Sequence, residues 1–413
     1  MPYLILDPTD EYAAHQMRFL DHLGLEAVLL FSSEGHRGTW QQRYAAELGG
    51  RVVGEHVVDR DDLAPLAAAL HDGFPEGCFG LVVWDERHVL LAAEIAEAVG
   101  LDWNPREVIE RFRDKSRMKA WLRAHGGVRV NRSRVVETAE EALRFQAELG
   151  AWPVVVKPSG GAGSMSVFFA AHADELLDGC QRVGERGLGD VLLEEYVGGA
   201  EYAVNGLADH SGGVLVTDVW RYDRRDSHGE RNVYFETLKV GSRDEPFADV
   251  AIYAAATIRA LGLRRSPFHM EVKVDDDGPC LIEVGARFAG GNQVAMASKL
   301  HRHSLFELAA CHFLDDIRVT AGDVDYERYD SLAARIVSGV QEREIASIRA
   351  VIGLDHVQSL PSFSGVGMLR KPGRPAPVSR DVTTKAWEVY LLHPDPAQVA
   401  ADARAVRALL RYE

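Results

Sequence analysis

The chain has 413 residues, of which 46% are hydrophobic and 26% are charged, and its formal net charge is -16. This length and composition are typical of a globular protein with two or three domains, and the negative charge argues against nucleic acid or an anionic membrane as a partner. The sequence begins without the basic region of a signal peptide, and it has no apolar run near the ~20 residues of a membrane span. Its four cysteines are scattered along the chain. We therefore expect a cytoplasmic protein with reduced thiols.

The first ~110 residues alternate short β-rich runs with helical stretches, which is the pattern of a parallel α/β sheet. A Rossmann dinucleotide site would need GxGxxG after the first strand, but Leu6 is followed by Asp7 and Pro8. We therefore predict a Rossmann-like N-terminal domain, residues 1–110, without that fingerprint. The expected strands are Tyr3–Leu6, Ala27–Phe31, Val52–Val53 and Gly80–Trp84, and the expected helices are Glu11–His22, Leu63–His71 and Leu90–Ala98.

Three further segments follow this domain. Residues 111–200 hold a basic helical stretch, a helix near Ala139–Leu149 and two strands around a glycine loop. Strands dominate residues 201–330, which close with a helix at Ser304–Phe313, and residues 331–413 mix short strands, turns and a C-terminal helix. We predict a lid subdomain, a catalytic subdomain and a closing subdomain for these three segments, in a protein of the α/β and α+β classes.

The glycine loop lies in the string WPVVVKPSGGAGSMSVFF, which reads as strand, loop and strand. Glycines let backbone amides approach phosphate oxygens, although no GK[ST] follows, so the loop is not a P-loop. Lys157 ends the apolar run Val154–Val156, where burying an ammonium is costly unless an anion meets it. The alternative is an ordinary glycine-rich hairpin with a surface lysine. The candidate phosphate-binding residues are Lys157, Ser159, Gly160, Gly161, Gly163 and Ser164.

A second candidate segment reads VLLEEYVGGAEYAV. An apolar strand that exposes backbone N–H and C=O groups at its end can bind the edge of adenine, and a carboxylate a few residues later can accept both ribose hydroxyl hydrogens. Glu194, Glu195 and Val197 are the candidates for the base, and Glu201 is the candidate for the ribose. The alternative is a strand that ends in a solvated acidic turn.

The third segment, HMEVKVDDDGPCLIEVGAR, predicts a hairpin with Glu271 and Glu283 on one face of paired strands and a turn at 275–278. Two neighbouring carboxylates repel each other unless a cation lies between them. Oxygen ligands suit Mg²⁺, which usually accompanies a nucleoside triphosphate, and Arg287 could bind a phosphoryl oxygen. The alternative is an exposed acidic hairpin. The apolar residues expected to alternate with the glutamates are Met270, Val272, Val274, Ile282 and Val284.

In their order and spacing, these segments resemble the ATP-grasp superfamily, strongly over residues 110–320. The resemblance implies a Rossmann-like N-terminal domain, a small ATP lid and a mixed-sheet C-terminal domain that carries the metal glutamates. It also implies ATP and Mg²⁺ as cofactors, with two ions expected and Mn²⁺ as a substitute. The residues that match the motifs are Lys115 after Asp114, Lys157, Glu194, Glu195, Val197, Glu201, the metal carboxylates Glu271 and Glu283, Arg287 and, as a weaker match, Lys239.

At two positions the chain departs from the motifs of particular ATP-grasp enzymes, which indicates the branch of the superfamily that it resembles. Dialanine ligases and biotin carboxylases place Asn two residues after the second metal Glu, where this chain has Gly285, so water or a phosphate oxygen would have to fill that position. Biotin carboxylases place a carboxylate where this chain has Gly291. The string EVGARFAGG instead resembles bacterial L-amino acid ligases of the bacilysin-dipeptide type, which implies that Gly290 and Gly291 close around an acyl phosphate.

The resemblance therefore implies an ADP-forming ligase that joins a carboxylate to an amine in a biosynthetic pathway, with small molecules, amino acids above all, as partners. It is compatible with a homodimer and implies no nucleic acid or membrane partner. In the basic, aromatic segment 221–239, the candidates for the substrate wall are Arg221, Arg231, Tyr234 and Glu236; the alternative is a solvated loop. Other candidate functions are a biotin-carboxylase-like or purine-pathway ATP-grasp enzyme and a non-catalytic nucleotide sensor.

Overall fold

The computed structural model describes residues 1–9, 11–22, 24–161, 166–290, 293–313 and 324–413. The N-terminal sheet has the strand order β3-β2-β1-β4, and its neighbouring strands are parallel. Both β1 and β2 are buried along their whole length, as expected for parallel strands covered on both faces. The predicted parallel α/β sheet is thus confirmed. Its strands are β1 (Tyr3–Leu6), β2 (Ala27–Phe31), β3 (Val52–Val57) and β4 (Gly80–Val82).

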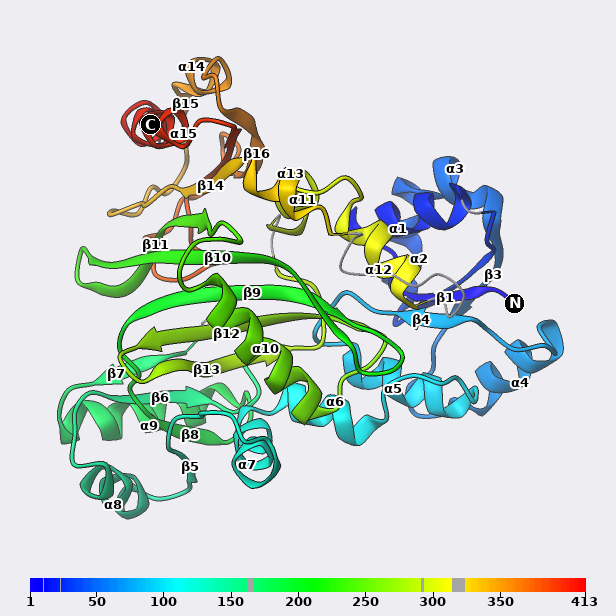
Figure 1. Ribbon diagram of the computed structural model, residues 1–413, viewed down its shortest axis with the longest axis horizontal. Coiled ribbons are helices and arrows are strands. Elements are labelled where there is room, and N and C mark those ends of the chain that lie inside the picture. Colours follow the sequence, from blue (N-terminus) through cyan, green and yellow to red (C-terminus); the bar gives the residue numbers. More distant parts are fainter. Residues whose placement is uncertain (10, 23, 162–165, 291–292, 314–323) are drawn as a thin grey trace.

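Short helices surround this sheet at the right of Figure 1. The helices expected from the sequence are present with shifts of one or two residues at their ends. The helical elements are α1 (Glu11–His22), α2 (Glu34–Arg43), α3 (Ala45–Leu48), η1 (Gly49–Arg51), α4 (Ala64–Gly73), α5 (Val89–Ala98) and, next in the chain, α6 (Arg106–Arg113) and α7 (Lys115–His125).

A second, antiparallel sheet holds the glycine loop and has the order β5-β8-β6-β7. Its helix α8 begins with a capping box between Thr138 and Glu141 and ends at Gly150, whose φ of 67° suits a residue without a Cβ. The sheet packs on α8 and α9 through a small core of its own. The elements are β5 (Ser133–Val136), α8 (Ala139–Leu149), β6 (Val154–Pro158), β7 (Phe168–Ala170), α9 (Ala173–Arg186) and β8 (Val191–Glu195).

The largest sheet has eight strands in the order β13-β12-β9-β10-β11-β14-β17-β16. We expected a mixed sheet here, but each pairing between neighbouring strands is antiparallel. Within the described residues, the chain forms hairpins such as β12–β13 in this sheet and no βαβ crossovers between neighbouring strands. The strands are β9 (Ala200–Ala208), β10 (Val214–Ser227), β11 (Glu230–Lys239), β12 (Ser266–Asp275), β13 (Gly278–Gly285), β14 (Ala333–Ser338), β16 (Phe363–Leu369) and β17 (Trp387–His393).

Helix α10 (Phe247–Leu261) lies across this sheet in Figure 1 and buries one apolar face. The end of the chain adds a separate core under β14 and β17. Because β11 pairs with β14, the sheet continues across residue 330, where we place a subdomain boundary; the boundaries stay a prediction. The remaining elements are α11 (Gln293–Ser298), α12 (Leu305–Phe313), α13 (Tyr326–Asp330), β15 (Val351–Ile352), α14 (Leu354–Gln358), α15 (Pro396–Leu409) and β18 (Arg411–Tyr412).

The main core is continuous from the N-terminal sheet to the large sheet. Trp84, just after β4, stacks on Phe288 with ring centroids 4.8 Å apart, and both rings contact Phe306. This aromatic cluster fixes the β4–α5 loop against the segment that follows β13. No helix in the described ranges combines the length and the hydropathy needed to cross a membrane.

Glu236 gives a stability prediction. Its side chain on β11 is 5% exposed and lies 2.9 Å from Arg335 on β14 and 2.5 Å from Arg407 on α15. Glu236→Gln removes the charge that both guanidinium groups face, so we expect the free energy of unfolding to fall by about 1–3 kcal/mol. Urea unfolding measures this change against the turn variant Asp276→Asn, and an unchanged midpoint for Glu236→Gln would contradict the structural role.

Candidate active site

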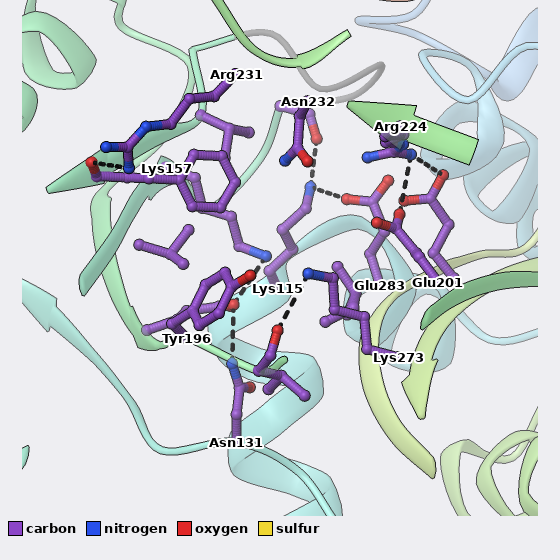
Figure 2. Close-up of a pocket in the computed structure, with 18 of the residues that line it drawn as sticks. Lys115, Asn131, Lys157, Tyr196, Glu201, Arg224, Arg231, Asn232, Lys273 and Glu283 are labelled. Atoms are coloured by element: carbon purple, nitrogen blue, oxygen red, sulfur yellow. Dashed lines mark hydrogen bonds and ion pairs between the residues drawn. The ribbon is translucent and has the colours of Figure 1, made fainter. Parts of the chain in front are cut away.

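The candidate site is a pocket between the glycine-loop sheet and the large sheet (Figure 2). One wall comes from β6, β8 and the segment after β8, and the other comes from β9 to β13. Eleven of the residues singled out from the sequence line it together, although they are spread over more than 160 positions of the chain. They are Lys115, Lys157, Gly161, Glu194, Glu195, Val197, Glu201, Arg231, Tyr234, Glu271 and Glu283.

Lys115, which follows Asp114 as in the matched motif, is the first residue of α7. Asp114 caps the helix by accepting hydrogen bonds from the backbone N–H groups of Ser116 and Arg117. The Lys115 ammonium donates to the Gly161 carbonyl and lies 3.2 Å from Oε2 of Glu283. One buried lysine thus joins the glycine loop to the acidic hairpin, which is the position that a phosphate chain between the two sheets would require.

Lys157 pairs with Glu194, its Nζ lying 3.0 Å from Oε2. A second lysine that the sequence analysis missed, Lys119, is fully buried and lies 2.6 Å from Oε1 of the same carboxylate. Burial raises the pKa of Glu194, but the two lysines outweigh it and hold the pKa at about 2. Burial lowers the pKa of Lys119 to about 8 despite this carboxylate. Glu194 therefore holds two cations in the pocket floor instead of meeting solvent.

The segment after β8 offers backbone groups for a planar base. Asn131 donates to the carbonyl of Glu195 at 2.8 Å, and Lys273 donates to the carbonyl of Val197 at 3.1 Å. The Glu195 side chain points instead to Arg132, 3.2 Å away, so only its backbone belongs to the site. Apolar surface for the faces of a base comes from Val155, Val167, Phe169, Tyr196 and Ile282.

The acidic hairpin has the predicted register: Glu271 pairs directly with Glu283 across β12 and β13. The sequence analysis was wrong about Ile282, which lines the pocket instead of alternating with the glutamates. The register shifts between Glu271 and Val272, which leaves Ile282 as an extra residue in β13. Such a bulge reverses the alternation over one residue, and bulges recur beside active sites.

Arg224 on β10 is a further residue that the sequence analysis missed. Its guanidinium lies 2.9 Å from Glu201 and 3.6 Å from Glu271, and it packs against the rings of Tyr222 and Tyr234. Burial, together with the Glu271 and Glu283 charges, raises the pKa of Glu201 against the opposing effect of Arg224. The pKa of Glu271 is lowered, because His269 and Arg224 outweigh its burial. The pocket thus brings the carboxylates of Glu201, Glu271 and Glu283 close together, and a bound cation would reduce the repulsion between them.

The donor chemistry fits a divalent cation, because carboxylate oxygens from two rigid strands are the ligands that Mg²⁺ prefers. No three His, Cys, Asp or Glu side chains in the described part of the chain are already arranged around one metal position. Lys115 and Arg224 lie against Glu283 and Glu271, so a cation would take over their role at these two carboxylates.

Arg287 lies just outside the pocket wall, where Glu86 holds it. Its Nη2 is 2.6 Å from Oε2 of Glu86, and Arg113 is 2.9 Å from Oε1 of the same carboxylate. Glu86 comes from the β4–α5 loop, more than 200 residues away in the sequence, and nothing in the local pattern singled it out. The guanidinium also lies within the electrostatic reach of Glu271 and Glu283.

The structure does not bring every candidate to the pocket. Arg221 is exposed on the opposite face of β10 from Arg224, and Glu236 belongs to the ion pairs with Arg335 and Arg407. A register shift opposite Asp223 and Arg224 places Tyr234 and Glu236 on different faces of β11. The Lys239 ammonium instead donates to the Tyr329 carbonyl at 2.7 Å, and burial lowers its pKa to about 8.

Six of the candidates from the glycine loop and from the segment after Arg287 do not line the pocket or lie outside the described residues. Ser159 uses its hydroxyl to accept a hydrogen bond from the Asp190 N–H, and Gly160 donates to the Leu188 carbonyl, so both shape the loop. Gly290 is exposed and does not line the pocket. The candidates that lie outside the described residues are Gly163, Ser164 and Gly291.

Comparisons with known proteins agree with this geometry. The family profile of the ATP-grasp domain matches residues 151–295. The chain contains an ATP-grasp domain. This domain holds both walls of the pocket and both hairpin glutamates, and the predicted resemblance and fold are confirmed at this level.

Among curated relatives, dapdiamide A synthase of Enterobacter agglomerans is 27% identical over 257 residues, which cover 60% of this chain and 59% of the relative. The chain thus spans about three fifths of that relative's length.

Among solved structures, the L-amino acid ligase of Bacillus licheniformis has a TM-score of 0.74 at 18% identity, covering 100% of this chain and 98% of the other. The biotin carboxylase domain of Hydrogenobacter thermophilus 2-oxoglutarate carboxylase, a dimer solved with MgADP, ADP and bicarbonate, has a TM-score of 0.65 at 16% identity and covers 100% of this chain and 90% of the other.

The buried pair of Lys157 and Glu194 leads to a binding prediction. Lys157→Met keeps the apolar stem and removes the ammonium, while Lys119 still balances Glu194. We expect ATP binding to weaken by about 1.5–3 kcal/mol, the scale of a charge-assisted hydrogen bond. Calorimetric titration with ATP measures this, with the exposed Lys371→Met as control, and equal affinities in the two variants would remove Lys157 from the nucleotide site.

Glu86 leads to a second prediction. Glu86→Gln weakens the pairing that orients Arg287 without touching a pocket wall. We expect turnover to fall roughly tenfold or more with little change in ATP affinity, because one charge-assisted hydrogen bond is worth about 1.5–3 kcal/mol. Steady-state kinetics and nucleotide titration separate the two effects. Asp85→Asn in the same loop, whose carboxylate pairs with Arg87, is the matched control; equal turnover in both variants would contradict the role of Glu86.

Proposed function

We propose that this protein is an ATP-dependent, ADP-forming ligase that joins a carboxylate to an amine through an acyl phosphate, with amino acids as substrates. The observation that carries the proposal is the direct pairing of Glu271 with Glu283 beside Lys115, at one end of a pocket whose other end offers Lys157 and the backbone carbonyls of Glu195 and Val197. The pocket therefore has complementary groups for a base at one end and for a phosphate chain with a cation at the other.

In this proposal each residue type has a physical task. The carbonyl of Glu195 accepts the amino hydrogen of adenine, and Glu201 accepts hydrogens from the ribose hydroxyls. Lys157 and Lys115 exchange their carboxylate partners for phosphate oxygens, which places the terminal phosphorus next to Glu283. Mg²⁺ bound to Glu271 and Glu283 would neutralise charge on the phosphate oxygens during transfer.

The chemical steps need positioning more than covalent help from the protein. An oxygen of the substrate carboxylate attacks the γ-phosphorus of ATP, ADP leaves, and the acyl phosphate forms. Arg287, oriented by Glu86, offers N–H donors to the acyl phosphate as its charge develops. An amine then attacks the acyl carbon, the C–O bond to phosphate breaks, and the amine loses a proton. Exclusion of water protects the intermediate from hydrolysis.

The choice of amino acids as substrates is supported by the names of two similar proteins, a dapdiamide A synthase and an L-amino acid ligase. Arg231 and Tyr234, which line the pocket beyond Arg224, are the substrate-wall candidates that the geometry favours. The sensor alternative is disfavoured, because a protein that only binds nucleotide does not need two carboxylates in register next to a phosphate-side lysine. A carboxylase is disfavoured by Gly285 and by Gly291, which lies outside the described residues.

The reaction class is tested by its products. A matrix of amino acids should reveal an acid that triggers release of ADP and phosphate, and a second amine should give a product with the mass of both substrates minus one water. Hydroxylamine in place of the amine should trap the acyl phosphate as a hydroxamate. AMP and pyrophosphate as products would refute the proposal, because they indicate an adenylate.

The metal hairpin is tested separately. Glu283→Gln should lower turnover by at least 100-fold at saturating Mg²⁺ while the fold persists, because the side chain is about one quarter exposed and is not part of the core. Circular dichroism checks the fold, and Asp277→Asn in the turn of the same hairpin serves as control. Near-normal turnover of Glu283→Gln would exclude the hairpin from the reaction.

A further inference from the structure

His269 lies on β12 two residues before Glu271, so both side chains are on the same face of the strand. Its side chain is 9% exposed, and its Nε2 is 3.8 Å from Oε1 of Glu271. The cross-strand partner of His269 is Gly285, which has no side chain to compete for the space opposite. The ring therefore lies one step beyond the two paired glutamates on the same face of the hairpin.

A chain of buried hydrogen bonds fixes the orientation of this ring. The Asp218 carboxylate is fully buried and accepts hydrogen bonds from Trp220 Nε1 and from Thr217 Oγ1. Asn205 Nδ2 also donates to Asp218, at 2.6 Å, so the Asn205 amide oxygen must face the other way. That oxygen is 2.7 Å from Nδ1 of His269.

The tautomer of His269 follows from this orientation. An amide oxygen only accepts, so Nδ1 of His269 carries the hydrogen and donates it to Asn205. Nε2 then faces the carboxylate of Glu271, where a protonated ring forms an ion pair with it and a neutral ring presents a lone pair to it. The proton on Nε2 and a divalent cation can therefore take the same place, because either one separates two electron-rich atoms in a buried site.

The distance suits a shared cation. Atoms that bind one octahedral cation at about 2.1 Å lie about 3 Å apart when adjacent and about 4 Å apart when opposite, and the Nε2–Oε1 distance of 3.8 Å falls between these limits. Arg224 faces Glu271 from 3.6 Å and has Glu201 as a closer partner at 2.9 Å, so it can release Glu271 without losing its own charge balance.

We propose that His269 is a nitrogen ligand of the divalent cation that Glu271 and Glu283 hold, oriented by Asn205 and Asp218. This inference rests on the proposed function only for the presence of a metal at the hairpin. It replaces the expectation that water or a phosphate oxygen alone fills the position beside Gly285. An imidazole nitrogen is a softer donor than a carboxylate oxygen, so the site should gain more affinity for Mn²⁺ than for Mg²⁺.

The test is metal binding, measured without turnover. Mn²⁺ is titrated into the protein in the presence of the methylene analogue of ATP, with free Mn²⁺ followed by electron paramagnetic resonance. Pulsed resonance on the bound ion then detects coupling to a nitrogen nucleus. We expect a nitrogen coupling in the wild-type protein that is absent in His269→Phe, and a Kd for Mn²⁺ raised roughly 10–100-fold in that variant. Mg²⁺ affinity, measured by competition, should fall less.

Three further variants keep the outcome interpretable. His303→Phe, at a half-exposed histidine outside the pocket, should bind Mn²⁺ like the wild type. Asn205→Leu should weaken Mn²⁺ binding by a smaller factor, because the ring remains but loses its orienting partner. If Glu283→Gln loses Mn²⁺ while His269→Phe keeps both its Mn²⁺ affinity and the nitrogen signal, the histidine proposal is overturned and the metal site stands. If neither variant affects Mn²⁺ binding, the metal site of the proposed function fails as well.

Discussion

The register of the β12–β13 hairpin is the constraint on which the rest of the site depends. By pairing Glu271 with Glu283, it holds two carboxylates side by side on rigid strands, where their repulsion must be balanced by positive charge. The surrounding elements supply that charge from different directions. Lys115 comes from the start of α7 and Arg224 comes from β10. A shift of β13 by one residue would turn Glu283 to the other face while β9 still holds Glu271, so the two carboxylates would be separated and Lys115 would lose its partner.

Ion pairs that join separate parts of the chain also explain how the pocket can accept a nucleotide. Lys157 is held by Glu194 and Lys115 by Glu283. In each pair the cation is buried or largely buried, and a phosphate oxygen can replace the carboxylate without exposing a bare charge. Binding then exchanges one set of charge-assisted contacts for another. Glu86 belongs to the N-terminal part, so its pair with Arg287 joins that part to the ATP-grasp domain.

The sequence predicts those features that depend on local pattern. The apolar runs of β1 and β2, the Asp114 cap before Lys115 and the turn that sets the Glu271–Glu283 register can each be inferred from a few neighbouring residues. Two single-residue bulges, at Ile282 and near Phe235, were not predictable, because a bulge adds one residue to a strand without a distinct composition. They account for the wrong placement of Ile282 and for the separation of Glu236 from Tyr234.

Other site residues were missed for different reasons. Lys119 lies four residues after Lys115 and shares its helix face, so the helical period could have revealed it. Arg224 is one of several arginines in a strand whose facing residues depend on the bulge. Glu86 pairs with Arg287 across 201 positions, in a region where Trp84 packs on Phe288. The chain of Asp218, Asn205 and His269 likewise joins three strand positions that only the sheet order makes adjacent.

The central claim is that a carboxylate is phosphorylated before the amine attacks, and an isotope experiment tests it most directly. The acid that stimulates ADP release is prepared with ¹⁸O in both carboxylate oxygens and turned over with its amine, and the inorganic phosphate is analysed by mass spectrometry. An acyl phosphate transfers one carboxylate oxygen to the phosphate when the amide forms, so the account predicts phosphate that carries a single ¹⁸O atom. Unlabelled phosphate, or label recovered in AMP, would contradict it.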